Sequence, residues 1–467
     1  MGKGMSPLAK RRLLRVGAPL LAALVLIGGV GAGLWGNSEV ARAAASYHSQ
    51  RQLLDTRLKA AGQQGYTGKD LESVTSQLRA LDGAEQPWWI PDQPNFYIRL
   101  KVRAEALQAQ LESLQNQLLT QAKADAGKQI EAAKSQIAQA QQANADDLDL
   151  RSLQQRLDGV ARAQGAAHNI HDYRAVAQQG QAVVSDATTV LQQAQQENQT
   201  IEQLAQQLVA QNNRNLGAIQ QAGNQALGGG RNEASIAAYM NRPSPFKGYD
   251  AAQRAYRRLE KFSGLIGNGD VNQAARGAAA AQRYAGQIHD AVMGNLPSKL
   301  VIVSFQAQHL WAYENSRVVL DSLVTTGVRG DTDYGTDFGP MKVLYKEHPH
   351  TMHSSWPKGS PYWYPDTVVQ WTTFFTWTGE AIHDASWQPD STLGPGSQYN
   401  KDIRSHGCIH IPAGRAEWMY NWAPVGMRVI VYPGDGSAVS NQLAQITTDD
   451  QGNPRSAAEA RRAGTTG

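Results

Sequence analysis

The chain of 467 residues contains a single cysteine, Cys408. A single thiol excludes an intrachain disulfide. A lone cysteine is either a small buried apolar residue or a nucleophile. One histidine stands two positions before this thiol and another two positions after it, in the run from Ser405 to Pro412. These surroundings favour a reactive cysteine.

A strong net charge is missing as well. The 44 Lys and Arg residues nearly balance the 40 Asp and Glu residues, which leaves a formal net charge of +4. This balance does not indicate general polyanion binding, so we predict no nucleic-acid partner. Aromatic residues are few, and most Trp and Phe fall into residues 88–96 or 305–422. Residues 100–295, rich in Ala, Gln and Asn, are instead typical of extended helices.

Acidic residues are absent from the first 37 positions. A basic tail over residues 1–15 precedes an apolar run over residues 16–35, and about 20 apolar residues can span a bilayer as a helix. Positive flanking charge favours a cytoplasmic N-terminus. We therefore predict a single-pass membrane protein with a transmembrane signal anchor at 16–35. A cleaved signal peptide is the alternative, since Ala41-Arg42-Ala43 has the form of a cleavage site.

Helical patterns fill the chain from the apolar run to residue 297. Residues 36–97 predict a segment with helices over 38–62 and 69–82 that ends in a Pro- and Trp-rich break. Residues 98–297 predict an Ala- and Gln-rich helical stalk. Its apolar residues first recur in heptad steps of three and four, at Ala104, Leu107, Leu111, Leu114 and Leu118. Antiparallel hairpins and a coiled coil both fit. Packing within the chain is favoured over a partner-binding face, and helical self-association stays open.

The end of the stalk has its own pattern. Residues 223–234 contain three consecutive glycines, at Gly228 to Gly230, and predict a flexible break. A further helical pair is predicted over 249–263 and 271–293.

Short β-branched and aromatic runs begin at Lys299. They predict a mostly β domain over residues 298–433, in which each run forms a strand. One of these strands is predicted over 368–375, and a helix is predicted over 413–422. The polar residues 434–467 predict a disordered tail. The expected fold class is therefore multidomain, with an α-helical, coiled-coil-like N-terminal region followed by a mostly β domain.

A thiol nucleophile needs a base, a group that orients the base, and donors for an oxyanion. His383 follows an apolar run, where a strand would hold its ring. Gly407 lets the backbone turn before Cys408, so amides of Gly407 and Cys408 could face a carbonyl oxygen. A helix beginning after Pro412 would favour the thiolate. No orienting group for the base can be identified from the sequence.

Around these residues the chain resembles the L,D-transpeptidases of the bacterial cell wall, whose catalytic domain is of the YkuD type. The resemblance covers roughly residues 298–433. It rests on the run Ser405 to Ile409 and on His383 upstream, with support from Thr326-Gly327 and the stretch Thr336 to Gly339.

The resemblance implies a cysteine acyltransferase that forms peptidoglycan cross-links without a cofactor. Cys408 would attack the carbonyl between the third and fourth residues of a stem tetrapeptide and release the terminal D-alanine. An amine of a neighbouring stem would then take the acyl group. His383 would be the general base, and the Gly407 and Cys408 amides would form the oxyanion hole. Peptidoglycan stem peptides would be the partners, with the domain outside the cytoplasm at the cell wall.

The same resemblance suggests residues around the substrate. His406 would shape the site or relay a proton, and Ser405 would help to shape it. Trp387 stands where some members carry a tryptophan near the substrate. His410 stands where the family usually has Arg or Asn, which leaves the group that binds the stem carboxylate open, and Arg404 is a cationic candidate.

Two further departures from the family pattern stand out. Asp384 replaces the usual Gly or Ser after the base, and residues 389–400 insert a longer loop at the rim of the cleft. The irregular aromatic stretch from Trp356 to Pro365 predicts a flap over the cleft.

The same residues also fit two alternative functions. Water in place of the amine would make the domain an L,D-carboxypeptidase, and a degenerate site would leave a helical cell-wall scaffold. His348, His350 and His353 form the densest histidine group, yet they lack the Glu of the usual zinc helix. We therefore predict no metal.

Overall fold

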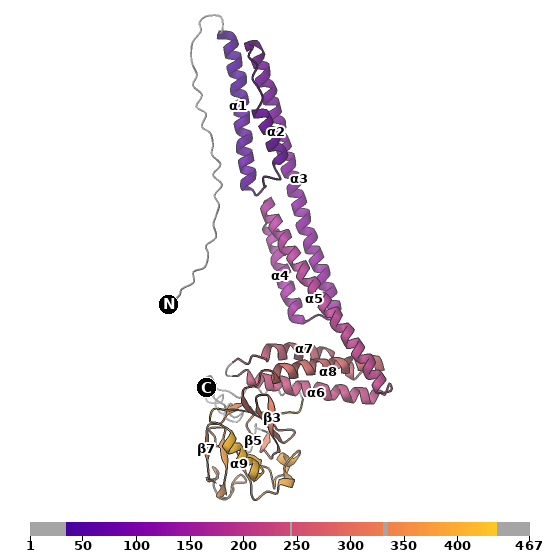
Figure 1. The fold of residues 1–467 in the computed structure, drawn as a ribbon, viewed down its shortest axis with the longest axis vertical. Helices are drawn as coiled ribbons and strands as arrows, with labels where there is room; N and C mark the ends of the chain where they lie inside the picture. Colours follow the sequence, from indigo (N-terminus) through magenta and orange to yellow (C-terminus); the bar gives the residue numbers. More distant parts are fainter. Residues whose placement is uncertain (1–33, 243–244, 330–334, 437–467) are drawn as a thin grey trace. The chain divides into compact units, whose positions relative to one another are not determined.

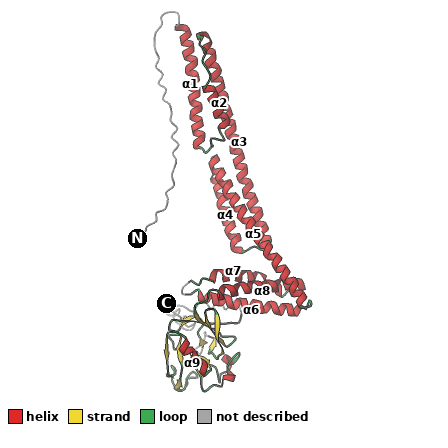
Figure 2. Cartoon of the chain, viewed as in Figure 1, coloured by secondary structure: helices red, strands yellow, loops and turns green. Residues whose placement is uncertain are grey.

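The computed structural model describes residues 34–242, 245–329 and 335–436 (Figures 1 and 2). They form two compact units. One comprises residues up to 139 together with 148–189, and the other comprises residues 140–147 together with 190 onward. The first unit is helical, and the second joins helices to a β domain. The predicted fold class, a helical N-terminal region followed by a mostly β domain, is confirmed.

The predicted tail at 1–15 and anchor at 16–35 lie outside the described residues, except for positions 34 and 35. Among the helices that the structure describes, none has an apolar stretch long enough to cross a bilayer. Their composition explains this, because the long helices are interrupted throughout by Gln and charged residues. The prediction of a single-pass membrane localisation is therefore wrong. Of the predicted tail 434–467, only residues 434–436 are described.

The helices begin and end close to where the sequence predicted. The Pro- and Trp-rich break falls between α2 and α3, with a short 3-10 turn, η1, inside it. The bounds are α1 Leu34–Gln63, α2 Glu72–Asp82, η1 Ile90–Asp92, α3 Gln93–Gln142, α4 Asp147–Ala166 and α5 Ile170–Gln211.

In the first unit, the heptad stripe of α3 faces other helices of the same chain. Ala104, Leu107 and Leu111 are buried in one cluster with residues of α1 and α2, and Leu114 and Leu118 pack against it. This arrangement agrees with the favoured prediction of packing within the chain (Figure 1).

Three further helices, α6 Leu216–Met240, α7 Tyr249–Ile266 and α8 Val271–Met293, pack against one another in the second unit. Asn215 and Asp270 cap α6 and α8, since their side chains accept hydrogen bonds from amides of the first turn. The buried face of α8 is a run of alanines, which lets the neighbouring helices approach closely.

The predicted flexible break at residues 223–234 is wrong, because α6 runs through it without interruption. Helix packing explains why glycine occurs there. A Cβ atom on Gly230 would lie 2.8 Å from Cδ2 of Leu259, and one on Gly223 would lie 2.8 Å from Cβ of Ala278. Gly228 and Gly229 have no such neighbour. Close contact with α7 and α8 thus stabilises a helix that local propensity alone disfavours.

The β domain contains two principal sheets. The first has the strand order β3-β2-β1-β13-β6, in which β1 and β13 are parallel and the other pairs are antiparallel. The second has the order β12-β11-β10-β7, in which β11 and β12 are parallel. The first sheet comprises β3 Arg317–Leu323, β2 His309–Glu314, β1 Lys299–Ser304, β13 Arg428–Tyr432 and β6 Gly339–Lys342. The second comprises β12 Ile409–Ile411, β11 Ala381–Asp384, β10 Thr372–Phe374 and β7 Tyr345–Glu347.

Smaller elements complete the domain. Helix α9, Ala413–Trp422, has the predicted bounds and packs on β10 and β11. Two short pairs lie outside the principal sheets: parallel β4 Val328–Arg329 with β5 Gly335–Thr336, and antiparallel β8 His350–Met352 with β9 Thr367–Val369.

The predicted strand at 368–375 is divided between β9 and β10. The division falls at Gln370 and Trp371, whose amides both donate to Oδ1 of Asp384, at 2.9 and 2.7 Å. A buried carboxylate needs such donors. These contacts explain the place of Asp384 in the chain, which the family pattern did not account for.

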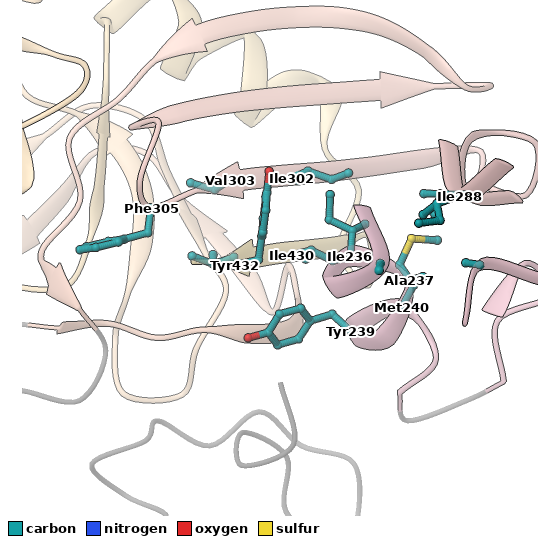
Figure 3. Packing of buried hydrophobic residues seen from close by; sticks show 14 of the residues in the cluster. Ile236, Ala237, Tyr239, Met240, Ile288, Ile302, Val303, Phe305, Ile430 and Tyr432 are labelled. Carbon is teal, nitrogen blue, oxygen red and sulfur yellow. The ribbon is translucent and has the colours of Figure 1, made fainter. Parts of the chain in front are cut away.

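The α6–α8 helices and the first sheet share one hydrophobic core (Figure 3). Ile236 and Met240 at the end of α6 are buried in the same cluster as Ile302 of β1 and Ile430 of β13. The guanidinium of Arg428 donates to the carbonyl of Met240 across this boundary. The β domain is thus one part of a larger hydrophobic unit.

Candidate active site

Two neighbouring parallel strands carry the predicted base and the residues next to the thiol. In the register of β11 and β12, Ile382 lies opposite Ile409 and His383 opposite His410. Cys408 directly precedes β12, so it stands beside Ala381 at the start of β11. Because side chains alternate along a strand, Cys408 and His383 project from the same face of the sheet as diagonal neighbours. The structure thereby brings the predicted nucleophile and base to one face.

The segment Thr325 to Gly327 holds the cysteine loop in place. Thr325 and His410 exchange two backbone hydrogen bonds, of 3.0 and 2.8 Å, and the Ser405 amide donates to the Thr326 carbonyl at 3.1 Å. The Thr336 hydroxyl accepts from the Gly327 amide at 2.8 Å and donates to the Gly407 carbonyl at 2.7 Å. Both threonine- and glycine-containing segments named from the sequence therefore support the loop.

Gly407 occupies a backbone conformation that other residues rarely adopt, with φ of +129°. A Cβ atom there would also lie 3.0 Å from Oε1 of Glu380 and 3.3 Å from the carbonyl oxygen of Gly335. The Glu380 carboxylate is itself fixed, because the Asp337 amide donates to both of its oxygens. This confirms that glycine is needed for the tight turn before the thiol.

Ser405 is buried, and its hydroxyl is engaged within the loop. It donates to the Cys408 carbonyl and accepts from the Gly407 amide at 3.1 Å. The Gly407 amide, which we predicted to face an oxyanion, has this hydroxyl as its partner here. The structure thus gives Ser405 a part in shaping the loop.

The Cys408 thiol is partly buried and neutral in this state. Burial raises its pKa to about 12, the Ala381 amide offsets part of the rise, and Glu380 adds to it. The sulfur lies 3.8 Å from the Gly379 carbonyl oxygen, a distance that allows a weak hydrogen bond from the thiol. Burial therefore favours the neutral thiol, and the expectation that α9 would favour a thiolate stays a prediction.

His383 is buried and suited to accept a proton. Its Nδ1 lies 2.8 Å from the carbonyl oxygen of Asp384, which can only accept, so Nδ1 carries the hydrogen and Nε2 the lone pair. Burial lowers the pKa of His383, so the ring is neutral at neutral pH. The Asp384 carbonyl is the orienting group that could not be identified from the sequence.

Several side chains form the walls of the site. Trp387 is 51 % exposed, and its ring centroid is 6.2 Å from that of His383. His406 is exposed, and its ring centroid is 5.0 Å from that of Tyr364. Desolvation lowers the pKa of His406, and the charge of Arg404 lowers it further. Arg404 is partly exposed, and its role in binding a carboxylate stays a prediction.

Tyr364 belongs to the predicted flap, which connects β8 to β9. Burial raises its pKa to about 12, and the neighbouring Cys408 adds to the rise. Its hydroxyl donates to the His353 carbonyl at 2.9 Å. Sequence reasoning named this tyrosine only within an aromatic run, because nothing in the sequence shows which flap residue reaches the thiol.

The histidines considered as metal ligands have three different sets of partners. His348 stacks on Trp371 with ring centroids 3.7 Å apart, His350 pairs with Glu347, and Nδ1 of His353 lies 3.0 Å from Asp366. Within the described ranges, no cluster of at least three His, Cys, Asp or Glu side chains could hold a metal ion.

Several solved structures are similar to part of this chain. Among solved structures, the chain is similar to an L,D-transpeptidase from Mycobacterium smegmatis, with 26% identity and a TM-score of 0.25 over 29% of this chain and 58% of that one. It is similar to a mutant L,D-transpeptidase from Enterococcus faecium, with 27% identity and a TM-score of 0.26, over 29% and 50% of the two chains. A third, from Mycobacterium tuberculosis H37Rv, has 26% identity and a TM-score of 0.23, over 29% and 57%. The match thus spans about half the length of each relative.

No curated protein matches the sequence at a significant level. One family model does match, and it covers the β domain with its candidate site. Residues 298–431 match the L,D-transpeptidase catalytic domain named YkuD, which confirms the resemblance seen in the sequence for this part of the chain.

Proposed function

We propose that the β domain is a cysteine-dependent L,D-transpeptidase that cross-links peptidoglycan stem peptides. The observation that carries the proposal is the placement of Cys408 and His383 on one face of two parallel strands, with His383 held as a base by the Asp384 carbonyl. Intact nucleophile, base and glycine turn argue against a non-catalytic scaffold.

The reaction begins from a neutral thiol and a neutral imidazole. Nε2 of His383 takes the proton of Cys408 as the sulfur attacks the carbonyl carbon between the third and fourth residues of a stem tetrapeptide. The resulting oxyanion is stabilised by the Cys408 amide, joined by the Gly407 amide once that group turns from Ser405 toward the substrate. The imidazolium then gives its proton to the departing nitrogen of D-alanine, which leaves a thioester on the enzyme.

The second half reverses these roles. The amine of a neighbouring stem attacks the thioester carbonyl and loses a proton to His383. Collapse breaks the carbon–sulfur bond, forms the cross-link and returns the proton to the Cys408 sulfur. Trp387, exposed beside the base, provides an apolar wall for the stem, and His406 with Tyr364 shapes another part of the site.

The proposal is tested by mass spectrometry of the full chain incubated with a stem tetrapeptide or a carbapenem. The wild-type protein should gain a covalent adduct at Cys408, and Cys408→Ala should gain none. His383→Gln should lose most of the rate while remaining folded, whereas the exposed control His168→Gln should react normally. An adduct on another residue, or normal reaction of Cys408→Ala, would refute the assignment.

Transfer and hydrolysis are separated by the products. With an amine acceptor present, a transpeptidase yields the cross-linked dimer, and an L,D-carboxypeptidase yields the tripeptide with or without the acceptor. Accumulation of tripeptide alone would replace the proposed transfer with hydrolysis in the same site.

A further inference from the structure

A series of buried, hydrogen-bonded polar side chains ends at His410. Its members are distant in the sequence, and each is at most 7% exposed. Ser397 Oγ lies 3.3 Å from Gln308 Oε1, Thr325 Oγ1 3.0 Å from Ser397 Oγ, Gln388 Nε2 3.1 Å from Thr325 Oγ1, and His410 Nδ1 2.8 Å from Gln388 Oε1. The reaction proposed above uses none of these contacts.

The backbone fixes which way the first amide points. The Thr326 amide can only donate, and it lies 2.8 Å from Oε1 of Gln308. The Phe305 carbonyl can only accept, and it lies 2.6 Å from Nε2 of Gln308. The oxygen and nitrogen of the Gln308 amide are thereby assigned by their partners.

From Gln308 onward, each link determines the next, because a hydroxyl has a single proton to donate. Ser397 must donate to the Gln308 oxygen, so Thr325 must donate to Ser397. Thr325 can then only accept from Gln388, which therefore presents its nitrogen to Thr325 and its oxygen to His410. An amide oxygen only accepts, so Nδ1 of His410 must carry the ring hydrogen.

This assignment matters because His410 lies beside the proposed base. The ring centroids of His383 and His410 are 5.0 Å apart. Those of Trp387 and His410 are 5.6 Å apart, with the two ring planes nearly perpendicular. Burial lowers the pKa of His410 well below its usual value, and the neighbouring His383 and His406 lower it further. Both rings are thus neutral with the hydrogen on Nδ1, and neither Nε2 has a proton to give to the other.

We infer that Gln388 is a positioning residue that keeps the proposed base free. By holding His410 as the Nδ1–H tautomer, it prevents an Nε2–H group from donating to the lone pair with which His383 receives the thiol proton. This role rests on the proposed function of His383. The hydrogen-bond chain through Thr325 and Ser397 makes the tautomer a property of the folded core rather than of the exposed cleft.

The inference is tested on the full chain labelled with ¹⁵N-histidine, with the His410 signals assigned from a His410→Gln variant. Nitrogen chemical shifts distinguish the two tautomers directly. In the wild-type protein His410 should be Nδ1–H. Gln388→Met, which removes the acceptor with little change in length, should give a mixture containing the Nε2–H form. Gln388→Glu should restore the Nδ1–H form, since a carboxylate also accepts.

Two more variants separate this role from simple packing. Thr325→Val keeps the shape but leaves the Gln388 amide without its fixed orientation, and it should also give mixed tautomers. Gln398→Met alters another buried glutamine, which donates to the Phe305 carbonyl at 3.2 Å but is not on the path to His410, and it should leave the wild-type tautomer.

Carbapenem acylation gives the functional result. Gln388→Met should acylate about two- to tenfold more slowly than wild type, the factor that one net hydrogen bond is worth, and Gln388→Glu should recover. An Nε2–H tautomer in the wild-type protein, or an unchanged tautomer in Gln388→Met, overturns the inference. Absence of any adduct in the wild-type protein overturns the proposed function instead, and it leaves the tautomer measurements as they are.

Discussion

Replacement of Gly407 by alanine tests how the turn before the thiol is built. The φ of +129° disfavours any side chain, at a cost of about 1–3 kcal/mol for a strained backbone. The new methyl group would also press on Glu380, 3.0 Å away. Because that carboxylate accepts two hydrogen bonds from the Asp337 amide, its retreat adds about 1 kcal/mol for weakened bonds. We expect a total loss of about 2–4 kcal/mol.

Gly426 is the matched control. It has φ of +86°, and a Cβ atom there would have no neighbour within 4 Å, so Gly426→Ala measures strain without crowding. Urea unfolding can be followed by tryptophan fluorescence, since most tryptophans lie in the β domain. Acylation provides the second readout, because a displacement of Cys408 by about 1 Å can slow the reaction on the order of 10²-fold. Equal losses of stability in the two variants, or wild-type acylation by Gly407→Ala, would refute the reasoning.

Three further predictions concern the base, the helices and the cleft. The lowered pKa of His383 predicts that acylation is lost only as the pH falls through a value below 6.5. Above that value the acylation rate should stay level until the Cys408 thiol ionises, at a pH near 12. A pH–rate profile with its midpoint above 6.5 would contradict this prediction. Gly230→Leu should destabilise the α6–α8 helices by about 1–3 kcal/mol through overpacking, whereas Gly228→Ala should stabilise them by about 0.5–1 kcal/mol, both measured by thermal unfolding of the helical circular-dichroism signal. Trp387→Ala should raise KM for the stem peptide and change stability by no more than about 0.5 kcal/mol; an unchanged KM would remove it from the substrate wall.

Local patterns were enough to predict most elements. The bounds of α9 and of the α7 and α8 pair follow from periodicity and from turn residues at their ends, which are properties of neighbouring positions. The candidate nucleophile and base could be proposed for a similar reason, since the motif around Cys408 is compact and a histidine after an apolar strand is a recognisable unit.

The remaining features depend on contacts between distant parts of the chain. The run of three glycines at 228–230 predicts a flexible break until Gly230 is packed against Leu259 of α7 and Ala285 of α8. The carboxylate of Asp384 divides a run of strand-forming residues by taking two of its amides, and no local pattern contains that contact.

The surroundings of His410 show the same limit. Gln308, Ser397 and Gln388 are ordinary polar residues with no periodic signal, and only the folded core orders them into a directed chain. The sequence shows that His410 departs from the family pattern, but it does not show that Gln388 is the hydrogen-bond partner of His410.

The shared core of α6 and the first sheet affects how the β domain could be transferred to another protein. A fragment cut at residue 298 would satisfy the family match, yet it would expose to water the face of Ile302 and Ile430 that α6 covers. Such an apolar face favours aggregation. A chimera that contains the β domain should therefore also contain the helices from Leu216 onward. The transferred segment is then the whole hydrophobic unit rather than only the residues that match the family model.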